Sequence, residues 1–492
     1  MEAILAGMQL ILDGSVCIAL FCGTLLGIIF GAIPGLTSTM GIALLVPITF
    51  SMQPAVGIAC MIGMYSGAIY GGSISAILLN IPGTPSSMMT SLDGYPLSAR
   101  GSAGLAIGVA TISSFVGGEI GVVCLIFAAP ALAKFALDFG PSEYVALCVF
   151  GLAIIANLSS GNLLKGILSG LLGVFFSTVG MDPITSIPRF TFGNLNLLAC
   201  LPFLPVLLGL FGFREFMEQL GLAKMKVTAN QNVHERLPSW GVLRGLTPTF
   251  LRGGLLGAFI GALPGAGGPI ASFLAYDVEK RVSKCPEKFG TGHLPGVAAS
   301  ESANNAVNGG AFIPMLTLGI PGDGNTAIML GALMMHNLRP GPMLFVEHAD
   351  FVSAIYLLNF LGNICMLLLG LLCIRSFIKI SLFPLNVLLP IVSVFCIIGS
   401  YSITNSVYAV QVMLFFGVLG YVLSLLGIPF MPMVLGFVLG PIAEGNFRSA
   451  LQISSGDWSI LFNSGISIFI FGVTAFMLAA PRIYRVIKTM RS

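Results

Sequence analysis

The pentapeptides GAIPG at residues 31–35 and GALPG at residues 261–265 begin two copies of one pattern. Each is followed by a Gly-Gly pair, an Ile-Pro-Gly triplet and an Arg-Gly or Arg-Pro-Gly, and the copies are offset by 230 to 240 positions. Proline lacks an amide hydrogen and glycine lacks a side chain, so both interrupt helices. Paired interruptions in two apolar halves predict a transporter whose binding site lies at the helix breaks, near the bilayer midplane. The residues of these breaks are Pro34, Gly35, Pro82, Gly83, Pro264, Gly265, Pro321 and Gly322.

The composition is that of a membrane protein. Of the 492 residues, 56% are hydrophobic and 8% are charged, whereas about a quarter of the residues in soluble domains are charged. Apolar runs recur along the chain, and those near twenty residues are long enough to span a bilayer as helices. Others are too short, and irregular backbone is tolerated at membrane depth only inside protein or beside water. We therefore predict an all-α polytopic membrane protein with roughly ten to twelve transmembrane helices and additional broken and re-entrant pieces.

Basic residues gather in three segments, which predict the topology. Of the 22 basic residues, six lie within 214–252, four within 280–288 and four within 482–491. Cytoplasmic segments carry such an excess of Lys and Arg. Because 254–276 is flanked by this charge on both sides, we expect it to form a re-entrant hairpin that turns at Pro264-Gly265. We divide the chain into repeat 1 (1–213), a cytoplasmic linker (214–253) and repeat 2 (254–492) with a short basic tail, and we expect no nucleic-acid partner.

Two further features are negative. The N-terminus lacks the basic segment of a secretory signal peptide, so we expect no cleavage. The ten cysteines include no CxxC pair and no His at zinc-ligand spacing, so we predict no metal site, no disulfide framework and no cofactor.

Polar residues follow the first Ile-Pro-Gly break. Thr84, Ser86 and Ser87 stand where a new half-helix would begin, with free backbone N–H groups and the positive end of the helix dipole available to an anion. Helix capping is the alternative. We predict that these residues bind substrate, because the arrangement recurs in the second half. Ser73 and Asn80, which precede the break, are candidate cation ligands.

The second break is followed by the sequence DGNT. Asn325 and Thr326 match the hydroxyl residues of the first half and are predicted to bind substrate. Asp323 has two interpretations: a helix N-cap, or a carboxylate that holds a coupling cation together with unwound carbonyl groups.

A third cluster precedes the second break. Glu301, Asn304, Asn305 and Asn308 fall at i, i+3, i+4 and i+7 and so share one helix face. We predict that Asn304 and Asn305 bind substrate and that Glu301 is a cation ligand, with interhelical hydrogen bonding as the alternative.

Two weaker features have structural explanations. Glu444 and Arg448 share a helix face at i,i+4, which predicts an ion pair. Asp93-Gly94 reads as an ordinary loop turn.

Four stretches of the chain resemble the large membrane subunit of bacterial tripartite tricarboxylate transporters, and the resemblance covers essentially the whole length. They are GAIPGLTSTMGIALLVPITF, YGGSISAILLNIPGTPSSMMTSLDGYPLSARG, GALPGAGGPIASFLAYDVEKR and ESANNAVNGGAFIPMLTLGIPGDGNTAIMLGALMMHNLRPGP. The family's recurrent motifs fall on Gly71 to Gly83 with the following TPSS, on Pro264-Gly265, on Glu301 to Asn305 and on Gly319 to Thr326. The Asp-Gly-Asn-Thr of the second break departs from the small residues of many relatives, so the resemblance does not extend to a role for Asp323.

The resemblance implies a secondary transporter of the bacterial inner membrane. It implies two partners: a small membrane subunit of about four membrane-spanning helices, and a periplasmic solute-binding protein that delivers a di- or tricarboxylate. Uptake would be driven by a gradient of Na⁺ or H⁺. By analogy with other broken-helix transporters, the two homologous repeats are expected to be inverted.

Two other functions are weighed against transport. A membrane-embedded hydrolase would need a nucleophile with its base or two facing acids, and the chain has no HExxH, Gly-x-Ser-Gly or GxGD motif. We therefore expect no enzymatic activity. A passive anion channel is compatible with the same sequence.

Overall fold

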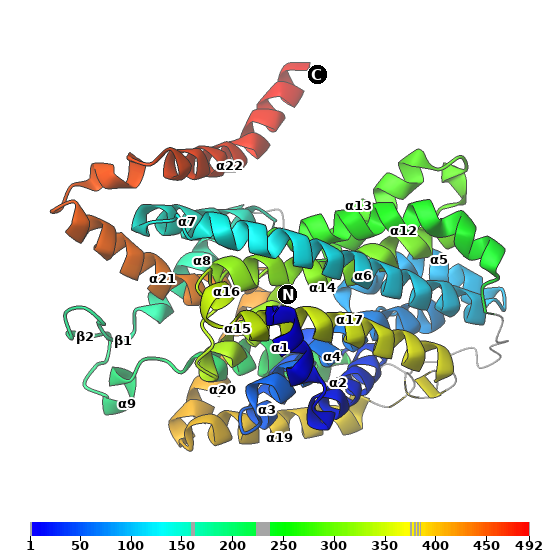
Figure 1. Ribbon diagram of the computed structural model, residues 1–492, viewed down its shortest axis with the longest axis horizontal. Coiled ribbons are helices and arrows are strands. Elements are labelled where there is room, and N and C mark those ends of the chain that lie inside the picture. Colours follow the sequence, from blue (N-terminus) through cyan, green and yellow to red (C-terminus); the bar gives the residue numbers. More distant parts are fainter. Residues whose placement is uncertain are drawn as a thin grey trace.

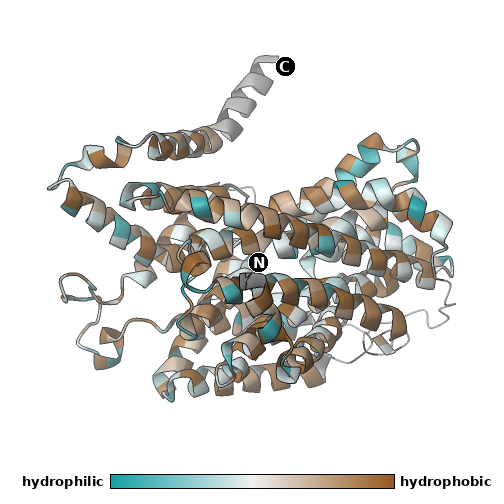
Figure 2. Ribbon diagram, in the orientation of Figure 1, coloured by the Kyte–Doolittle hydropathy of each residue, from teal (hydrophilic) through white to brown (hydrophobic). Residues whose placement is uncertain are grey.

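The structure is a computed structural model that describes residues 2–158, 163–222, 237–373, 376–377, 380, 383 and 385–491. These residues form a helical protein with two very short strands (Figure 1). Figure 2 shows hydrophobic residues along most of the helices. Six helices of the described part are long and apolar enough to cross a membrane, and shorter apolar helices accompany them. The prediction of an all-α polytopic membrane protein is therefore confirmed.

Each repeat contains five corresponding α-helices, one of them long and buried, with short helical elements inserted at different points of the series. The first series is α2 (Gly14–Ala32), α3 (Ser38–Thr49), α4 (Pro54–Leu79), η1 (Pro85–Ser87), α5 (Met88–Ala99) and α6 (Ala103–Ala136). The second is α12 (Trp240–Gly261), α13 (Gly267–Val282), η3 (Pro286–Lys288), α14 (Leu294–Leu318), α15 (Gly324–Met335), α16 (Leu344–Glu347) and α17 (Ala349–Leu372).

The remaining elements begin the chain, follow each series or end the chain. They are α1 (Glu2–Ile11), α7 (Pro141–Leu158), α8 (Leu163–Ser177), β1 (Gly180–Met181), β2 (Pro188–Arg189), α9 (Leu195–Leu198), α10 (Phe203–Leu207), the π-helix η2 (Leu208–Phe213), α11 (Arg214–Leu222), α19 (Leu385–Thr404), α20 (Val407–Leu425), α21 (Met431–Ile453), η4 (Trp458–Phe462) and α22 (Gly465–Arg491). The strands β1 and β2 pair antiparallel, with Gly180 opposite Arg189.

Glycines spaced four apart bring the helices of each repeat into close contact. Gly23, Gly27 and Gly31 of α2 face α4, and a Cβ at Gly23 would lie 2.1 Å from the carbonyl oxygen of Cys60. In the second repeat, glycines 253, 257 and 261 of α12 face α14 in the same way. Small residues at such spacing let helix backbones approach each other in a membrane.

Contacts along three helix pairs determine the relative direction of α4 and α14. Successive contacts are Ile62–Gly362 and Tyr70–Gly370 for α4 with α17, Thr111–Gly370 and Gly118–Asn363 for α6 with α17, and Ser302–Gly117 and Ala306–Gly121 for α14 with α6. Residue numbers rise together along the first and third pairs and in opposite senses along the second. Consequently α4 runs antiparallel to α14, and the two repeats have inverted orientations.

The segment around Pro264-Gly265 forms a helical hairpin. The arms α12 and α13 pack against each other, and Arg252 on one arm forms a 2.8 Å ion pair with Glu279 on the other. Helix α12 begins at Trp240, inside the segment 214–253 that we predict to be a linker, because Leu246 and Phe250 are buried in the core. Residues 223–236 of that segment lie outside the described residues.

Asp93 does not lie in a loop turn. It is a buried residue of α5 and accepts hydrogen bonds from the Tyr276 hydroxyl at 2.8 Å and from the backbone N–H groups of Gly290, Gly292 and His293 at 2.7–2.9 Å. The turn prediction is therefore wrong, since donors more than 180 residues away in sequence stabilise this carboxylate inside a helix.

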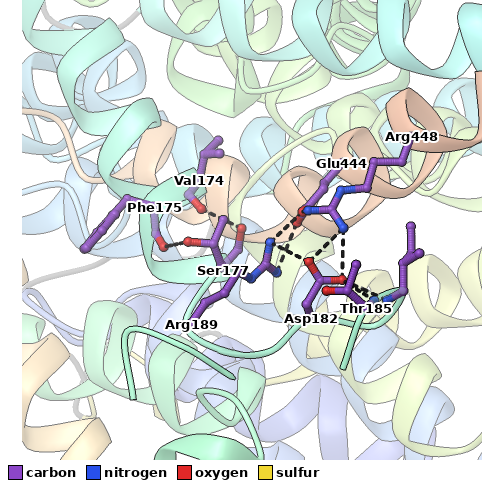
Figure 3. A network of polar contacts seen from close by, with 10 residues as sticks. Val174, Phe175, Ser177, Asp182, Thr185, Arg189, Glu444 and Arg448 are labelled. Carbon is purple, nitrogen blue, oxygen red and sulfur yellow. Dashed lines mark hydrogen bonds and ion pairs between the residues drawn. The ribbon is translucent and has the colours of Figure 1, made fainter. Parts of the chain in front are cut away.

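The predicted Glu444–Arg448 pair is present on α21, with Arg448 Nη2 and Glu444 Oε1 2.7 Å apart. Two residues of the β1–β2 hairpin extend it (Figure 3): Arg448 donates to both oxygens of Asp182, and Arg189 Nη1 donates to Glu444 Oε1 at 2.6 Å. These contacts attach the hairpin to α21.

Candidate functional site

A cavity of about 310 Å³ lies where the four helix breaks meet. Each break contributes the N-terminal residues of a helix, namely α3, η1, α13 and α15. The lining residues are Thr37, Ser38, Thr39, Thr84, Pro85, Ser86, Gly265, Ala266, Gly267, Gly268, Pro269, Asp323, Gly324 and Asn325, together with Ile69, Phe211, Arg214, Glu215, Phe430 and Met431. The sequence prediction that the breaks come together at one place is therefore consistent with the fold.

The first break is built by close backbone contacts. Helix α4 ends at Asn80, whose left-handed conformation (φ 55°) turns the chain. A Cβ at Gly83 would lie 1.8 Å from a main-chain oxygen of α2. Beyond it, the Thr84 hydroxyl lies 3.1 Å from that of Ser86 and 3.0 Å from that of Ser87. Thr84 and Ser86 line the cavity, whereas Ser87 is buried behind them.

The second break is capped by a carboxylate. Helix α14 ends at Gly319, also left-handed (φ 69°), and Asp323 forms a capping box with Thr326. Asp323 Oδ1 accepts from the Thr326 amide at 2.9 Å and hydroxyl at 2.8 Å. Its Oδ2 accepts from the Tyr65 hydroxyl at 2.6 Å and the Asn325 amide at 3.1 Å. Asp323 and Asn325 line the cavity, while Thr326 is fully buried in the cap.

The tip of the α12–α13 hairpin is fixed to the second break of its own repeat and touches the first break of the other. The Gly265 amide donates to the Gly322 carbonyl at 2.7 Å. A Cβ at Gly268 would lie 2.7 Å from Ser86 Cβ and 2.9 Å from Asn304 Oδ1. Only glycine fits at this tip, which places Asn304 directly behind the cavity wall.

Polar residues continue from Asn304 into the core along α14. Glu301 is fully buried and accepts from the hydroxyls of Thr90 on α5 and Ser114 on α6, the latter at 3.0 Å. Both polar atoms of the Asn304 side chain, and Oδ1 of Asn305, are buried without a hydrogen-bond partner.

Two sequence-predicted cation ligands lie away from the cavity. The Ser73 hydroxyl donates to the Tyr70 carbonyl at 2.8 Å, and Asn80 is exposed at the end of α4. Their predicted role stays a prediction. Among the described residues, no group of three or more His, Cys, Asp or Glu side chains is placed to hold a metal ion.

Arg214 and residues Thr37–Thr39 of the cavity lining were missed by sequence reasoning. Arg214 is the basic residue of the lining; it donates to Glu218 and Glu215, and its guanidinium lies 4.0 Å from the Phe430 ring centre. Thr37–Thr39 follow Pro34-Gly35 after one intervening residue, so the repeat itself contained the signal that could have identified them.

The site combines groups that suit an organic anion. Four helix N-termini present backbone N–H groups and the positive ends of their dipoles. Hydroxyl and amide side chains and one guanidinium add further donors. A volume of about 310 Å³ is at the lower end of the range for small-molecule sites.

Comparisons with known proteins identify one family and two relatives. A model of the tripartite tricarboxylate transporter TctA family matches residues 17–435. An uncharacterized 52.8 kDa protein from the TAR-I ttuC' 3' region of Agrobacterium vitis is 39% identical over 447 residues, which cover 91% of this chain and 89% of that protein. An uncharacterized protein from the TAR-II ttuC' 3' region of the same organism is 39% identical over 217 residues, which are 44% of this chain and 90% of that protein. No solved structure matches.

Proposed function

The chain belongs to the tripartite tricarboxylate transporter TctA family, and we propose that it is the large membrane subunit of a binding-protein-dependent secondary transporter that imports di- or tricarboxylates. The carboxylate binds in the cavity between the helix breaks. The chain has no enzymatic role in this proposal.

One observation carries the substrate class: four helix N-termini converge on one small cavity. Each N-terminus is equivalent to roughly half a positive charge, so four of them compensate about two negative charges without a full cluster of basic residues. A ligand with two or three carboxylates matches this charge and this number of donors, since the acidic lining residues are already paired, Asp323 in the α15 cap and Glu215 with Arg214. A monovalent anion would leave part of them unused.

The family supports the rest of the assembly. The family is described as tripartite, which supports two partners for this large subunit: a small membrane subunit and a periplasmic solute-binding protein. The large subunit lies in the inner membrane in this proposal. The inverted repeats support alternating access, because each repeat can open the shared cavity toward one side. A secondary transporter must also couple uptake to an ion gradient, and Na⁺ or H⁺ is the coupling ion.

The test is concentrative uptake. The large and small subunits are reconstituted into liposomes with the binding protein, and accumulation of labelled di- and tricarboxylates is measured against an imposed Na⁺ or H⁺ gradient. The proposal requires accumulation above the external concentration. Equilibration without accumulation would identify a passive anion channel.

Substitution of Ser86 tests the cavity itself. Ser86→Ala removes a lining hydroxyl beside the Gly268 tip without adding volume. Loss of one hydrogen bond to a charged ligand costs about 1.5–3 kcal/mol, so KM should rise about tenfold or more. Ser51→Ala, at an exposed position beyond the other end of α3, is the matched control and should leave KM unchanged. An unchanged KM in Ser86→Ala would exclude this hydroxyl from the binding site.

A further inference from the structure

We propose that the coupling ion is a monovalent cation, Na⁺, held at Glu301 by oxygen ligands from α5, α6 and α14, and that Asp323 is a structural cap. The assignment of the ion to coupling rests on the proposed function, but binding of the ion does not.

The two carboxylates near the breaks differ in what surrounds them. Asp323 accepts four hydrogen bonds, two to each oxygen, and the Thr326 amide and hydroxyl both belong to its capping box. A cation at Asp323 would have to displace these donors and break the cap of α15.

Glu301 has only hydroxyl partners. Its Oε1 accepts from Thr90 and its Oε2 from Ser114, and Thr90 Oγ1 also lies 3.0 Å from Ser300 Oγ. A hydroxyl can rotate its proton away and present its oxygen to a cation. Neighbouring hydroxyls of α6 already donate to the carbonyl four residues earlier, as Thr111 does to Ile107. The hydroxyl groups around Glu301 can therefore change from hydrogen-bond donors to cation ligands without movement of a helix.

Two unpartnered amide groups lie on the same helix as this carboxylate, three and four residues further along the chain. Asn304 and Asn305 are fully buried, and the Oδ1 atom of each has no hydrogen-bond partner. Asn304 lies beside the Glu301 carboxylate without forming a regular hydrogen bond to it. Buried polar atoms are nearly always satisfied, so orphans indicate a missing ion or water. A proton on Glu301 could satisfy at most one of the two amide oxygens, whereas hard cations such as Na⁺ accept several oxygen ligands of this kind.

The charge of the site selects a monovalent ion. Glu301 is fully buried, and within the described part of the chain no Lys, Arg or His forms an ion pair with it. An isolated charge in a low-dielectric interior is costly unless paired. One Na⁺ neutralises one carboxylate, while a divalent cation would leave an excess charge.

The position of the site explains how the ion could affect the substrate. Glu301 and Asn304 are one helical turn apart on α14, and Asn304 Oδ1 faces the Gly268 tip and Ser86 at the cavity wall. Coordination of the cation by Asn304 Oδ1 would turn this amide and direct its NH₂ group toward the wall. Ion binding thus fixes one side of the carboxylate cavity.

The experiment measures ion binding without transport. The thermal midpoint, Tm, of the purified large subunit is followed while Na⁺ replaces choline at constant ionic strength. A ligand that binds only the folded state raises Tm as it saturates. We expect Tm of the wild type and of Asp323→Asn to rise with Na⁺, and that of Glu301→Gln to be insensitive to it. Thr90→Val and Ser114→Ala remove one ligand each and should raise the half-saturating Na⁺ concentration severalfold even if Glu301→Gln does not fold.

Three outcomes overturn the proposal: a wild-type Tm that does not respond to Na⁺, a response retained in Glu301→Gln, or a response lost in Asp323→Asn. A wild type that responds equally to K⁺ overturns the assignment of Na⁺. None of these outcomes affects the carboxylate uptake assay, so failure of the ion site is distinguishable from failure of the proposed function. In that assay, Glu301→Gln should lose Na⁺-driven net uptake and retain exchange of internal for external carboxylate.

Discussion

Asp182 illustrates, at the scale of one residue, how a carboxylate outside the membrane-spanning helices holds a loop in place. The backbone N–H groups of Thr185 and Ile184 donate to it, and with Arg448 they hold the pKa of Asp182 well below its usual range. A folded pKa below the unfolded value of about 3.9 stabilises the structure at every pH above that value. The contribution is lost only as pH falls through the folded pKa.

This shift predicts how the β1–β2 hairpin responds to pH. Hydrogen exchange of residues 180–189, corrected for intrinsic rates, should be the same at pH 7 and pH 5, because Asp182 stays ionised throughout. Asp182→Asn should increase exchange at both pH values, since the ion pair with Arg448 is removed. Asp457→Asn, at an exposed helix cap, is the control. Opening of the wild-type hairpin between pH 7 and pH 5 would show that another group controls it.

At the scale of elements, close contact between helices positions the site. Close packing within the α2–α4 pair and within the α12–α14 pair positions the helix breaks of each repeat. Glycine is required where the main chains touch. The paired glycines leave little room for side chains, so the breaks have well-defined positions. The cavity is therefore set by helix packing rather than by its lining side chains.

Gly257→Val tests this packing. A Cβ at Gly257 would lie 2.2 Å from the Ala303 carbonyl oxygen, so α12 and α14 must separate. Overpacking costs about 1–3 kcal/mol or more, and we expect loss of most monodisperse protein in detergent and a lower Tm for the remainder. Gly241→Val, on the same helix with no atom nearby, should behave like the wild type. Equal yields of the two variants would contradict the close α12–α14 contact.

The sequence predicted the elements better than their partners. Helix breaks depend on local properties of Pro and Gly, so the four breaks and their repetition were visible in the chain. Arg214 was assigned to a linker because its neighbours in sequence are polar, although the fold brings it to Phe430 and the cavity. Asp93 was read as a turn residue because Gly94 follows it. In both cases the decisive contacts are long-range, and local pattern contains no information about them.

At the scale of the whole molecule, the inverted repeats exchange helices. Helix α6 of the first repeat packs along α14 of the second, and α17 of the second packs along α4 of the first. Each long buried helix is thereby held by both repeats, and the hairpin tip of the second repeat reaches the break of the first. The site is shared, so neither repeat alone contains a complete binding cavity.

The orientation of the molecule in the membrane gives the last prediction. Elements α10, η2 and α11 run without interruption from Phe203 to Leu222, and twenty helical residues of about 1.5 Å rise are long enough to cross a hydrocarbon core of about 30 Å. We expect this helix to separate the loop that contains Leu195 from the basic residues that follow Leu222 in the sequence. The positive-inside rule places these basic residues, and Lys284 after α13, in the cytoplasm. Leu195, with 80% of its surface exposed, is then expected to face the opposite side of the membrane.

Single cysteines at the two positions, in a background without the ten native cysteines, test this orientation with a membrane-impermeant thiol reagent. Leu195→Cys should label in intact cells, whereas Lys284→Cys should label only after the membrane is opened, because both positions are exposed and differ only in the side they face. Labelling of Lys284→Cys alone in intact cells would reverse the orientation. Labelling of both would place Leu195 and Lys284 on the same side of the membrane. That result would contradict the prediction that the α12–α13 hairpin enters and returns from the cytoplasmic side.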